Sequence, residues 1–318
     1  MAEILIGPAG WAYKDWEGIV YPPGLSAQRA GKGKQHPLEF LARYFDLVEI
    51  NTTFYGHVKP AVAKQWVSMT TAVNARFCFT AKLNRAFTHS PIAVVESTSA
   101  ATIKPGNEDE EFARAGLDAL AGEGRLGAVL AQFPISFKCT SENQQYVGEL
   151  LHRFGAYPLA VELRHISWNN PQTLAQLAAE GAAFCNIDQP LLGKALRPST
   201  HLTSSIGYVR LHGRNYDQWF THERPHDRYN YLYKPAELER WKPRIEAVAQ
   251  NADRVFVVAN NHFEGKAAAN SLQLKSPSPA NPCLLQSRWP IVTQTSRHLS
   301  SRRNNLPNFN GTSGCSPA

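Results

Sequence analysis

The feature that most restricts the fold of this sequence is a strand-like segment that recurs eight times, with helical patterns between the copies. The segments are rich in Val, Ile, Leu and Phe and end in polar or glycine residues. They cover residues 3–7, 46–51, 76–82, 127–133, 159–164, 182–188, 206–212 and 254–260. Alternating strands and helices form parallel sheets, because each helix carries the chain back to the start of the next strand. The pattern predicts an α/β fold, a closed (β/α)8 barrel of the TIM type.

Helical patterns fill most of the intervals between these segments. They cover residues 37–45, 60–69, 171–180 and 235–250, and Ser141 with Gln144 forms a helix-capping signature before Tyr146, Leu150 and Leu151. Residues 84–109 are expected to form a long loop, and residues 190–205 show no convincing helix. An open doubly wound sheet is the alternative architecture, although no glycine-rich phosphate-binding motif follows the first segment.

The last part of the chain has a different composition. After Lys275, Ser, Pro, Asn, Thr and Arg dominate with little periodicity, which predicts a disordered segment over residues 276–318. We therefore expect one TIM-type barrel domain over residues 1–275. Only residues 265–275 remain for the last helix, so we expect that helix to be truncated. Our hypothesis is that the tail is a frameshifted or otherwise altered C-terminus.

Composition and charge favour a cytoplasmic protein without a membrane partner. No apolar run approaches the ~18–20 residues that span a bilayer, and acidic Glu3 is atypical of a signal peptide. The five cysteines form no CxxC pair, which is typical of buried thiols in a reducing compartment. The net charge is +7, and four arginines in residues 276–318 leave only +3 for the barrel.

Candidate site residues lie at the ends of the strand-like segments, because active sites of TIM barrels lie at the carboxyl ends of the strands. In residues 159–165, alternation places Ala160, Glu162 and Arg164 on one face of a strand. Similar polar side chains end nearly every other segment. We predict that the catalytic residues are Glu49, Lys82, Glu162, Asp188 and His212. We predict that the substrate-binding residues are Trp11, Asn51, Tyr55, Gln132, Arg164, Arg210, Arg214 and Asn260.

Three chemistries are open to this set. One is a divalent metal bound by Glu49, Glu162, Asp188 and His212, although no HxH or HxxE spacing supports it. The second is metal-free catalysis, with Glu162 or Glu49 as base and Lys82 or His212 as acid. The third is recognition of an anion, because the basic side chains of the set outnumber its carboxylates. The second and third chemistries are compatible.

Structural roles compete with these functions. Glu162 and Arg164 also suit an ion pair that braces the barrel mouth. Aromatic side chains in residues 11–16 and 54–55 more often pack a loop than stack on a sugar or a base. His57, His89 and His165 are isolated in expected loops and are predicted to lie on the surface. No GxSxG motif is present, which argues against an acyl hydrolase.

An ordered set of short motifs points to a family. The motifs include Ile6-Gly7, Val48-Glu49-Ile50-Asn51, Gln132-Phe133-Pro134, Val161-Glu162-Leu163-Arg164, Val209-Arg210-Leu211-His212-Gly213 and Asn260-Asn261-His262. On these motifs the chain resembles the YecE-like family, domain of unknown function 72, up to about Lys275. The resemblance implies a TIM-type barrel in cytosolic proteins and leaves the reaction open. After Lys275 the chain departs from the family.

Two functions of different classes follow. The first is an enzyme, a hydrolase, isomerase or lyase, that acts by acid/base chemistry on a small anionic or sugar-like substrate at the strand ends. The alternative is a nucleic-acid-binding protein that uses the cleft arginines and the basic tail. The mild charge of the barrel favours the enzyme. A third alternative is a barrel that has lost its activity with its final helix. The sequence indicates no oligomeric state and no cofactor beyond the divalent metal.

Overall fold

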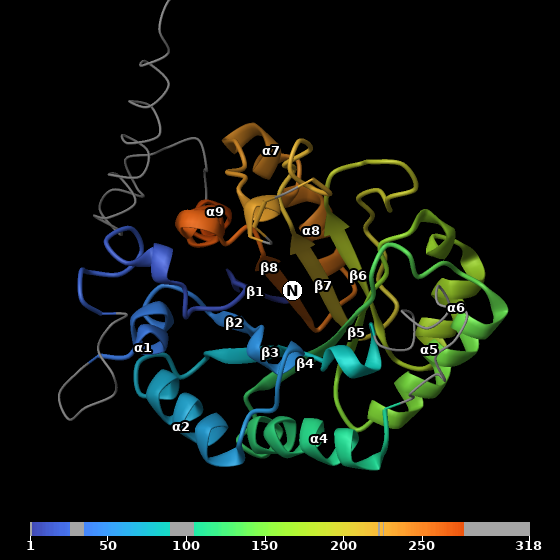
Figure 1. Ribbon diagram of the computed structural model, residues 1–318, viewed down its shortest axis with the longest axis horizontal. Coiled ribbons are helices and arrows are strands. Elements are labelled where there is room, and N and C mark those ends of the chain that lie inside the picture. The colour runs from blue at the N-terminus through green and yellow to red at the C-terminus, as the bar shows by residue number, and fades with distance from the viewer. Residues whose placement is uncertain (1, 26–34, 90–104, 222, 225, 277–318) are drawn as a thin grey trace, which may run out of the picture.

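The structure is a computed structural model that describes residues 2–25, 35–89, 105–221, 223–224 and 226–276. Its eight strands are parallel and lie in the order β1-β8-β7-β6-β5-β4-β3-β2, with helices around them (Figure 1). The strands are β1 Glu3–Pro8, β2 Leu47–Ile50, β3 Cys78–Lys82, β4 Leu126–Gln132, β5 Leu159–Glu162, β6 Ala183–Asp188, β7 Ile206–Leu211 and β8 Arg254–Ala259. The predicted barrel fold is confirmed.

The barrel closes where β1 meets β2. Ala9 forms an isolated parallel bridge with Glu49, and the Gly10 amide donates to the Glu49 carbonyl oxygen at 2.8 Å. A Cβ added at Gly7 would lie 1.9 Å from the Leu47 carbonyl oxygen, so only glycine permits this approach of the two backbones. The eight strands therefore form a nearly closed ring.

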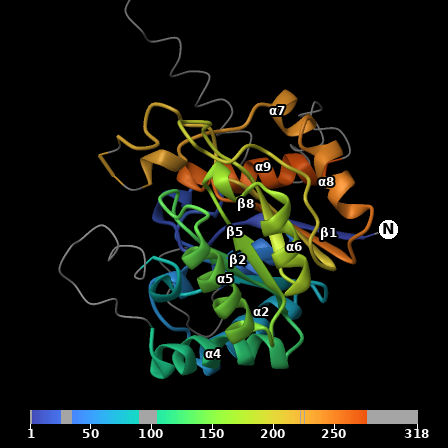
Figure 2. The same ribbon diagram turned by 90° about the vertical axis from the view of Figure 1, so that its right-hand side faces the viewer.

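Helices cover the outside of the strands, as Figure 2 shows in a view turned by 90°. They are α1 Pro37–Ala42, α2 Pro60–Thr71, α4 Asn107–Gly122, α5 Ser141–Phe154, α6 Pro171–Ala179, α7 Pro235–Glu239, α8 Lys242–Ala249 and α9 Lys266–Lys275. The single helix expected over residues 235–250 is two helices, α7 and α8. Pro243 lies in the first turn of α8, where its missing N–H costs no hydrogen bond, and it cannot continue α7.

The long loop expected over residues 84–109 is only partly described. A 3-10 turn covers Arg85–Phe87, and α4, which the sequence analysis did not predict, begins at Asn107. Residues 90–104 lie outside the described residues. Residues 190–205 contain no helix, as expected.

The last helix is present and closes the outer layer beside β1 and β8. Leu272 and Leu274 are buried, and Lys275 Nζ donates to Asp46 Oδ2 at 2.8 Å. The predicted tail falls almost wholly in residues 277–318, outside the described residues, so its disorder and its altered origin stay predictions. Among the described helices, none combines the length and the apolar character needed to cross a membrane.

Candidate active site

A buried arginine lies at the centre of the upper barrel. Arg210 of β7 is fully buried, and its Nη2 donates to Glu49 Oε1 at 2.6 Å. Its Nη1 donates to Glu162 Oε2 at 2.5 Å and to Gln132 Oε1 at 3.0 Å. One guanidinium therefore connects β7 to β2, β5 and β4, and four predicted site residues meet in one layer of the barrel.

Glu49 is bonded through both carboxylate oxygens. Besides the bond to Arg210, its Oε2 accepts a hydrogen bond from the Tyr208 hydroxyl at 2.9 Å. The same hydroxyl lies 2.9 Å from Thr80 Oγ1. Burial raises the pKa of Tyr208 well above its usual value, so the phenol keeps the proton that it donates.

Glu162 is held as a carboxylate. Its Oε1 accepts from Arg164 Nε at 2.6 Å and lies 3.1 Å from His212 Nε2. Burial alone would raise the pKa of Glu162, but Arg210, His212 and Arg164 outweigh burial and hold that pKa well below its usual range. The predicted pairing of Glu162 with Arg164 is therefore confirmed, inside a larger network.

His212 is a neutral imidazole within this network. Burial lowers its pKa to about 3, against the opposing charge of Glu162. Asn260 Nδ2 lies 3.0 Å from His212 Nδ1, so the amide donates to Nδ1 and the ring proton sits on Nε2, facing Glu162. His212 thus joins the end of β8 to the end of β5 and carries no charge near neutral pH.

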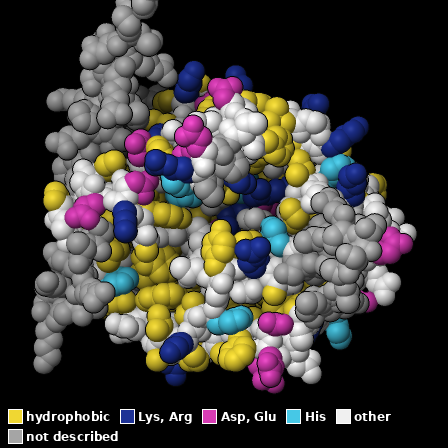
Figure 3. Space-filling view, in the orientation of Figure 1, with side chains coloured by type: hydrophobic (Ala, Val, Ile, Leu, Met, Phe, Trp, Pro, Cys, Tyr) yellow, Lys and Arg dark blue, Asp and Glu magenta, His cyan; other side chains and the backbone are white. Residues whose placement is uncertain are grey.

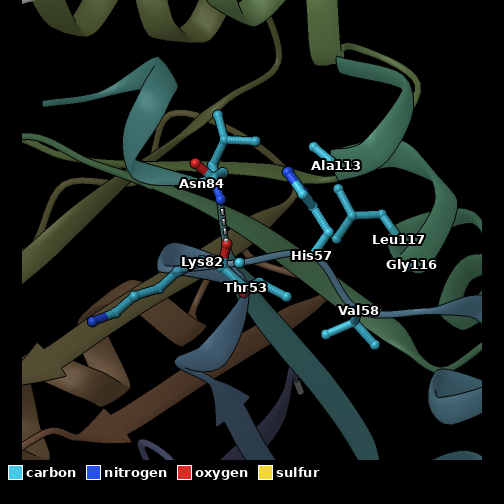
Figure 4. Close-up of a pocket in the computed structure, with 10 residues that line it drawn as sticks. Thr53, His57, Val58, Lys82, Asn84, Ala113, Gly116 and Leu117 are labelled. Atoms are coloured by element: carbon cyan, nitrogen blue, oxygen red, sulfur yellow. Dashed lines mark hydrogen bonds between the residues drawn. The ribbon is translucent and has the colours of Figure 1, made fainter. Parts of the chain in front are cut away.

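Lys82, at the end of β3, differs from its charged neighbours. Its side chain is only 9% exposed, yet within the described part of the chain its Nζ has no hydrogen-bond acceptor or ion-pair partner. Burial lowers the pKa of Lys82 to about 7, with Arg210 adding to the shift and Glu49 and Glu162 opposing it. The Nζ lies 5.6 Å from the centre of the Phe54 ring. Figure 4 shows the side chain extending away from a small pocket beside α4.

Aromatic rings line one side of the barrel mouth. Tyr13 stacks on His262 with 4.5 Å between ring centres, and Tyr229 lies 4.9 Å from the same histidine. Asn51 Nδ2 donates to the Tyr13 hydroxyl at 3.2 Å, while the buried Asn51 Oδ1 has no partner among the described residues. Trp219 meets His212 edge-on at 6.4 Å. His262 belongs to a motif quoted above but was not predicted as a site residue. Tyr229 and Trp219, which lie between β7 and α7, were not predicted at all.

His89 lies nearer to the site than expected. His89 was expected on the surface, but its side chain is half-buried, and its ring meets Phe54 edge-on at 5.0 Å. Burial lowers the pKa of His89 to about 4, and the positive charges of Arg164 and Lys82 contribute to the shift. The 3-10 turn after β3 therefore brings a neutral imidazole towards the charged network.

Asp188 and Arg214 lie apart from this network, although both were predicted as site residues. The register pairs Asp188 with Leu211, which packs in the outer apolar layer with Tyr233 and Trp241. Arg214 Nε donates to both oxygens of Asp188, at 3.0 and 3.1 Å. Interior positions of β6 are instead occupied by small or apolar side chains. Asp188 and Arg214 therefore form a separate pair outside the barrel.

Trp11 and Tyr55 also lie away from the network. Trp11 is buried and meets Trp66 of α2 edge-on at 4.9 Å, so it packs in the core. Tyr55 is 75% exposed and packs only against Phe54 among the described aromatic rings. The structural role weighed for these aromatic residues is confirmed for Trp11.

The predicted metal ligands do not fit a metal as they are arranged. Asp188 is outside the barrel, and the oxygens of Glu49 and Glu162 already accept hydrogen bonds from arginine, tyrosine or histidine. Within the described ranges, no three His, Cys, Asp or Glu side chains gather in a geometry that could hold an ion.

The charge of the network favours an anion. Two carboxylates, Glu49 and Glu162, face Arg210 and Arg164, so a protonated Lys82 adds an excess positive charge. Figure 3 shows Lys and Arg side chains gathered near the middle of the face above the strands. Of the two arginines in the network, Arg164 is the more exposed, with 11% of its side chain accessible to solvent and none of the Arg210 side chain. A small anion at the mouth would neutralise the excess charge.

Comparisons with known proteins agree with this architecture. UPF0759 protein YunF of Bacillus subtilis (strain 168) is 30% identical over 284 residues, which cover 85% of this chain and 93% of that protein. A crystal structure of a DUF72 family protein from Thermotoga maritima is 31% identical, with a TM-score of 0.70 over 86% of this chain and 98% of the other. One from Enterococcus faecalis, 24% identical with a TM-score of 0.69, covers 86% and 94% and shares the fold.

The family model described as "Protein of unknown function DUF72" matches residues 5–286. Its span includes most of β1, all the other strands of the barrel and every residue of the buried network, and it extends past Lys275, where the resemblance was expected to end. The chain belongs to the DUF72 family.

Proposed function

We propose that this protein is an enzyme that acts by acid/base chemistry on a small anionic substrate bound in the mouth of the barrel. The observation that carries the proposal is the Lys82 amine, which is buried beside two arginines without an acceptor of its own in the described residues. Burying a cationic group costs free energy unless a partner is supplied. A substrate anion is the partner that this arrangement lacks.

The proton-transfer group that we propose is Lys82. A catalytic acid or base works best when its pKa lies near the working pH, and the pKa of Lys82 is about 7. Glu49 and Glu162 were predicted as bases, but their oxygens are engaged by Arg210, Arg164 and the Tyr208 hydroxyl. We assign these two carboxylates to fixing the arginines in place.

The anion-binding groups that we propose are Arg164 and Gln132. Arg164 uses Nε for Glu162, and its Nη2 lies 3.4 Å from His212 Nε2, which leaves other N–H groups of its planar guanidinium for a carboxylate or phosphate. Gln132 accepts from Arg210 through Oε1, and its amide nitrogen is a donor for the same ligand. Asn260 and His212 hold the opposite wall of the site.

A sugar-like substrate is supported by the stacked Tyr13 and His262 and by Tyr229 beside them. Rings of this kind offer an apolar face to the C–H groups of a sugar. The orphaned Asn51 Oδ1 would accept a hydrogen bond from a hydroxyl. A sugar acid or a sugar phosphate combines both features and is the substrate class that we favour.

The experiment is a thermal-shift screen of small carboxylates, phosphate monoesters and sugar phosphates, with each stabilising compound then followed by NMR for turnover. We expect Lys82→Met to abolish turnover and Arg164→Gln to weaken binding. Arg43→Gln, at an exposed arginine after α1, is the matched control and should behave as wild type. The proposal fails if no anion stabilises the protein, or if the Lys82 and Arg164 variants respond as the control does.

No observation favours nucleic-acid binding over this proposal. Arg210 is bonded to two internal carboxylates, and Arg214 is bonded to Asp188 and Glu237. The basic tail lies outside the described residues. Nucleic-acid binding stays the alternative function, and the cytoplasmic location stays a prediction.

A further inference from the structure

We propose that Lys82 is a nucleophile that forms an imine with an aldehyde or ketone group of an anionic substrate. The inference deepens the proposed function, on which it rests, because it names the reactive group of the substrate. The same lysine that exchanges a proton near neutral pH would also attack a carbonyl carbon.

The first support is the isolation of the Lys82 amine. Lys266, the other buried lysine among the described residues, is 4% exposed, but its Nζ lies 3.1 Å from Glu264 Oε2 and 4.7 Å from the centre of the Phe263 ring. Lys82 Nζ has no acceptor in the described part of the chain. Its electron pair is therefore free for a substrate once the proton has left.

The second support is the electrostatic surroundings of Lys82. Arg210 of β7, Arg164 after β5, His89 after β3 and His262 after β8 face it, along with the carboxylates Glu49 of β2 and Glu162 of β5. Burial and the two arginines outweigh the carboxylates, and the pKa of about 7 leaves roughly half of the amine unprotonated at neutral pH. An ordinary lysine has only about one unprotonated amine in a few thousand.

The third support is the place of Asn51 beside Lys82. Ile50 pairs with Ala81 in the β2–β3 register, so Asn51, directly after the end of β2, follows Ile50 as Lys82, the last residue of β3, follows Ala81. Asn51 Oδ1 is buried without a donor among the described residues. A buried acceptor of this kind is costly unless a ligand supplies the hydrogen bond. The carbinolamine hydroxyl or the iminium N–H of the intermediate is such a donor.

The reaction needs no redox partner. The neutral amine attacks the carbonyl carbon, the C–O π electrons move to oxygen, and a proton passes from nitrogen to that oxygen. The oxygen of the resulting carbinolamine takes up a proton from solvent and leaves as water, while the nitrogen lone pair forms the C=N bond of a protonated imine. Arg164 holds the carboxylate or phosphate of the substrate during these steps.

The experiment is reductive trapping with glyoxylate and sodium cyanoborohydride near neutral pH, with the modified lysine located by peptide mass spectrometry. Lys82 should be modified at least ~10-fold faster than exposed Lys64, because a much larger fraction of the Lys82 amine is unprotonated at neutral pH. The lower nucleophilicity of a less basic amine offsets part of this advantage. Lys82→Arg should remove this fast reaction, and Lys266→Arg, the buried matched control, should not. If Lys82→Arg fails to fold, Lys82→Met serves the same purpose.

Glycolate, which has the same size and charge but no carbonyl group, separates the two proposals. If glycolate binds to the wild type and not to Arg164→Gln, while glyoxylate modifies Lys82 no faster than Lys64, the imine is overturned and the anion site stands. If glycolate does not bind and Lys82 shows no fast modification, both proposals fail. Fast modification at Lys82 supports the imine.

Discussion

Arg210 Nη2 lies 2.6 Å from Glu49 Oε1 and so joins β7 to β2, two strands that β8 and β1 separate in the sheet. The same guanidinium also bonds Glu162. Each of these charged side chains is completely buried. The arginine is thus the shared counter-ion of two buried carboxylates. Glu162 is also paired with Arg164, whereas Glu49 has no other ion-pair partner among the described residues.

Arg210→Met should destabilise the fold by about 3–5 kcal/mol, because both carboxylates lose their common partner. Urea unfolding measures the loss. Arg43→Met, at an exposed arginine, should stay within about 0.5 kcal/mol of wild type. A loss for Arg210→Met as small as that of the control would show that the network contributes nothing to stability.

Lys82→Met should stabilise the protein by about 1–3 kcal/mol near neutral pH, because it removes a buried amine whose charge the fold disfavours. The folded pKa of about 7 lies below the usual lysine value of 10.5, so between these values the unfolded chain holds a proton that the folded chain has released. Stability of the wild type therefore rises with pH across that window. The advantage of Lys82→Met should be largest below about pH 7 and vanish near pH 10.5. If Lys82→Met is less stable than wild type at every pH, burial of the Lys82 amine does not cost the free energy that we expect.

Stability should fall as the pH drops from 6.5 towards 4, because the pKa values of His212, His262 and His89 are lowered by burial to about 3, 4 and 4. In that window the unfolded chain binds protons that the folded chain does not. Denaturant unfolding at several pH values gives the slope. His89→Gln should reduce the slope by up to one proton, and exposed His57→Gln should not change it. Equal slopes in both variants would show that His89 does not contribute to the loss of stability at low pH.

Arg214→Met should lower stability without changing anion binding, because its partners Asp188 and Glu237 lie outside the mouth. Burial raises the pKa of Asp188 and Arg214 opposes that shift, so the loss leaves a carboxyl group that is costly to ionise. We expect about 1–3 kcal/mol by urea unfolding. Arg164→Gln should show the reverse, weaker binding with a smaller loss of stability. Weaker anion binding in Arg214→Met would show that Asp188 and Arg214 take part in the anion site after all.

Strand alternation was a good guide to the network on β5 and β7. Glu162 and Arg164, like Arg210 and His212, are two residues apart and point to the same side, as the hydrogen bonds between them confirm. The prediction worked because these strands are otherwise apolar and their charged side chains share one parity.

The same reasoning was wrong for β6. There Cys185 and Ile187 occupy interior positions, while Asn186 accepts from the amide of His201 and Asp188 binds Arg214 on the outside. Polar character alone does not reveal the interior face when the outer face also carries bonded polar side chains. The aromatic wall could not be predicted either, since loop conformations follow no period.

The most direct test of the account is a calorimetric titration of oxalate, which is fully ionised over the range used, into the wild type and Lys82→Met. Because the pKa of Lys82 is about 7, we predict that wild-type affinity is roughly tenfold higher near pH 6 than near pH 8, and that the difference disappears in Lys82→Met. No binding, or a pH dependence that survives the substitution, would contradict an anion site built around Lys82.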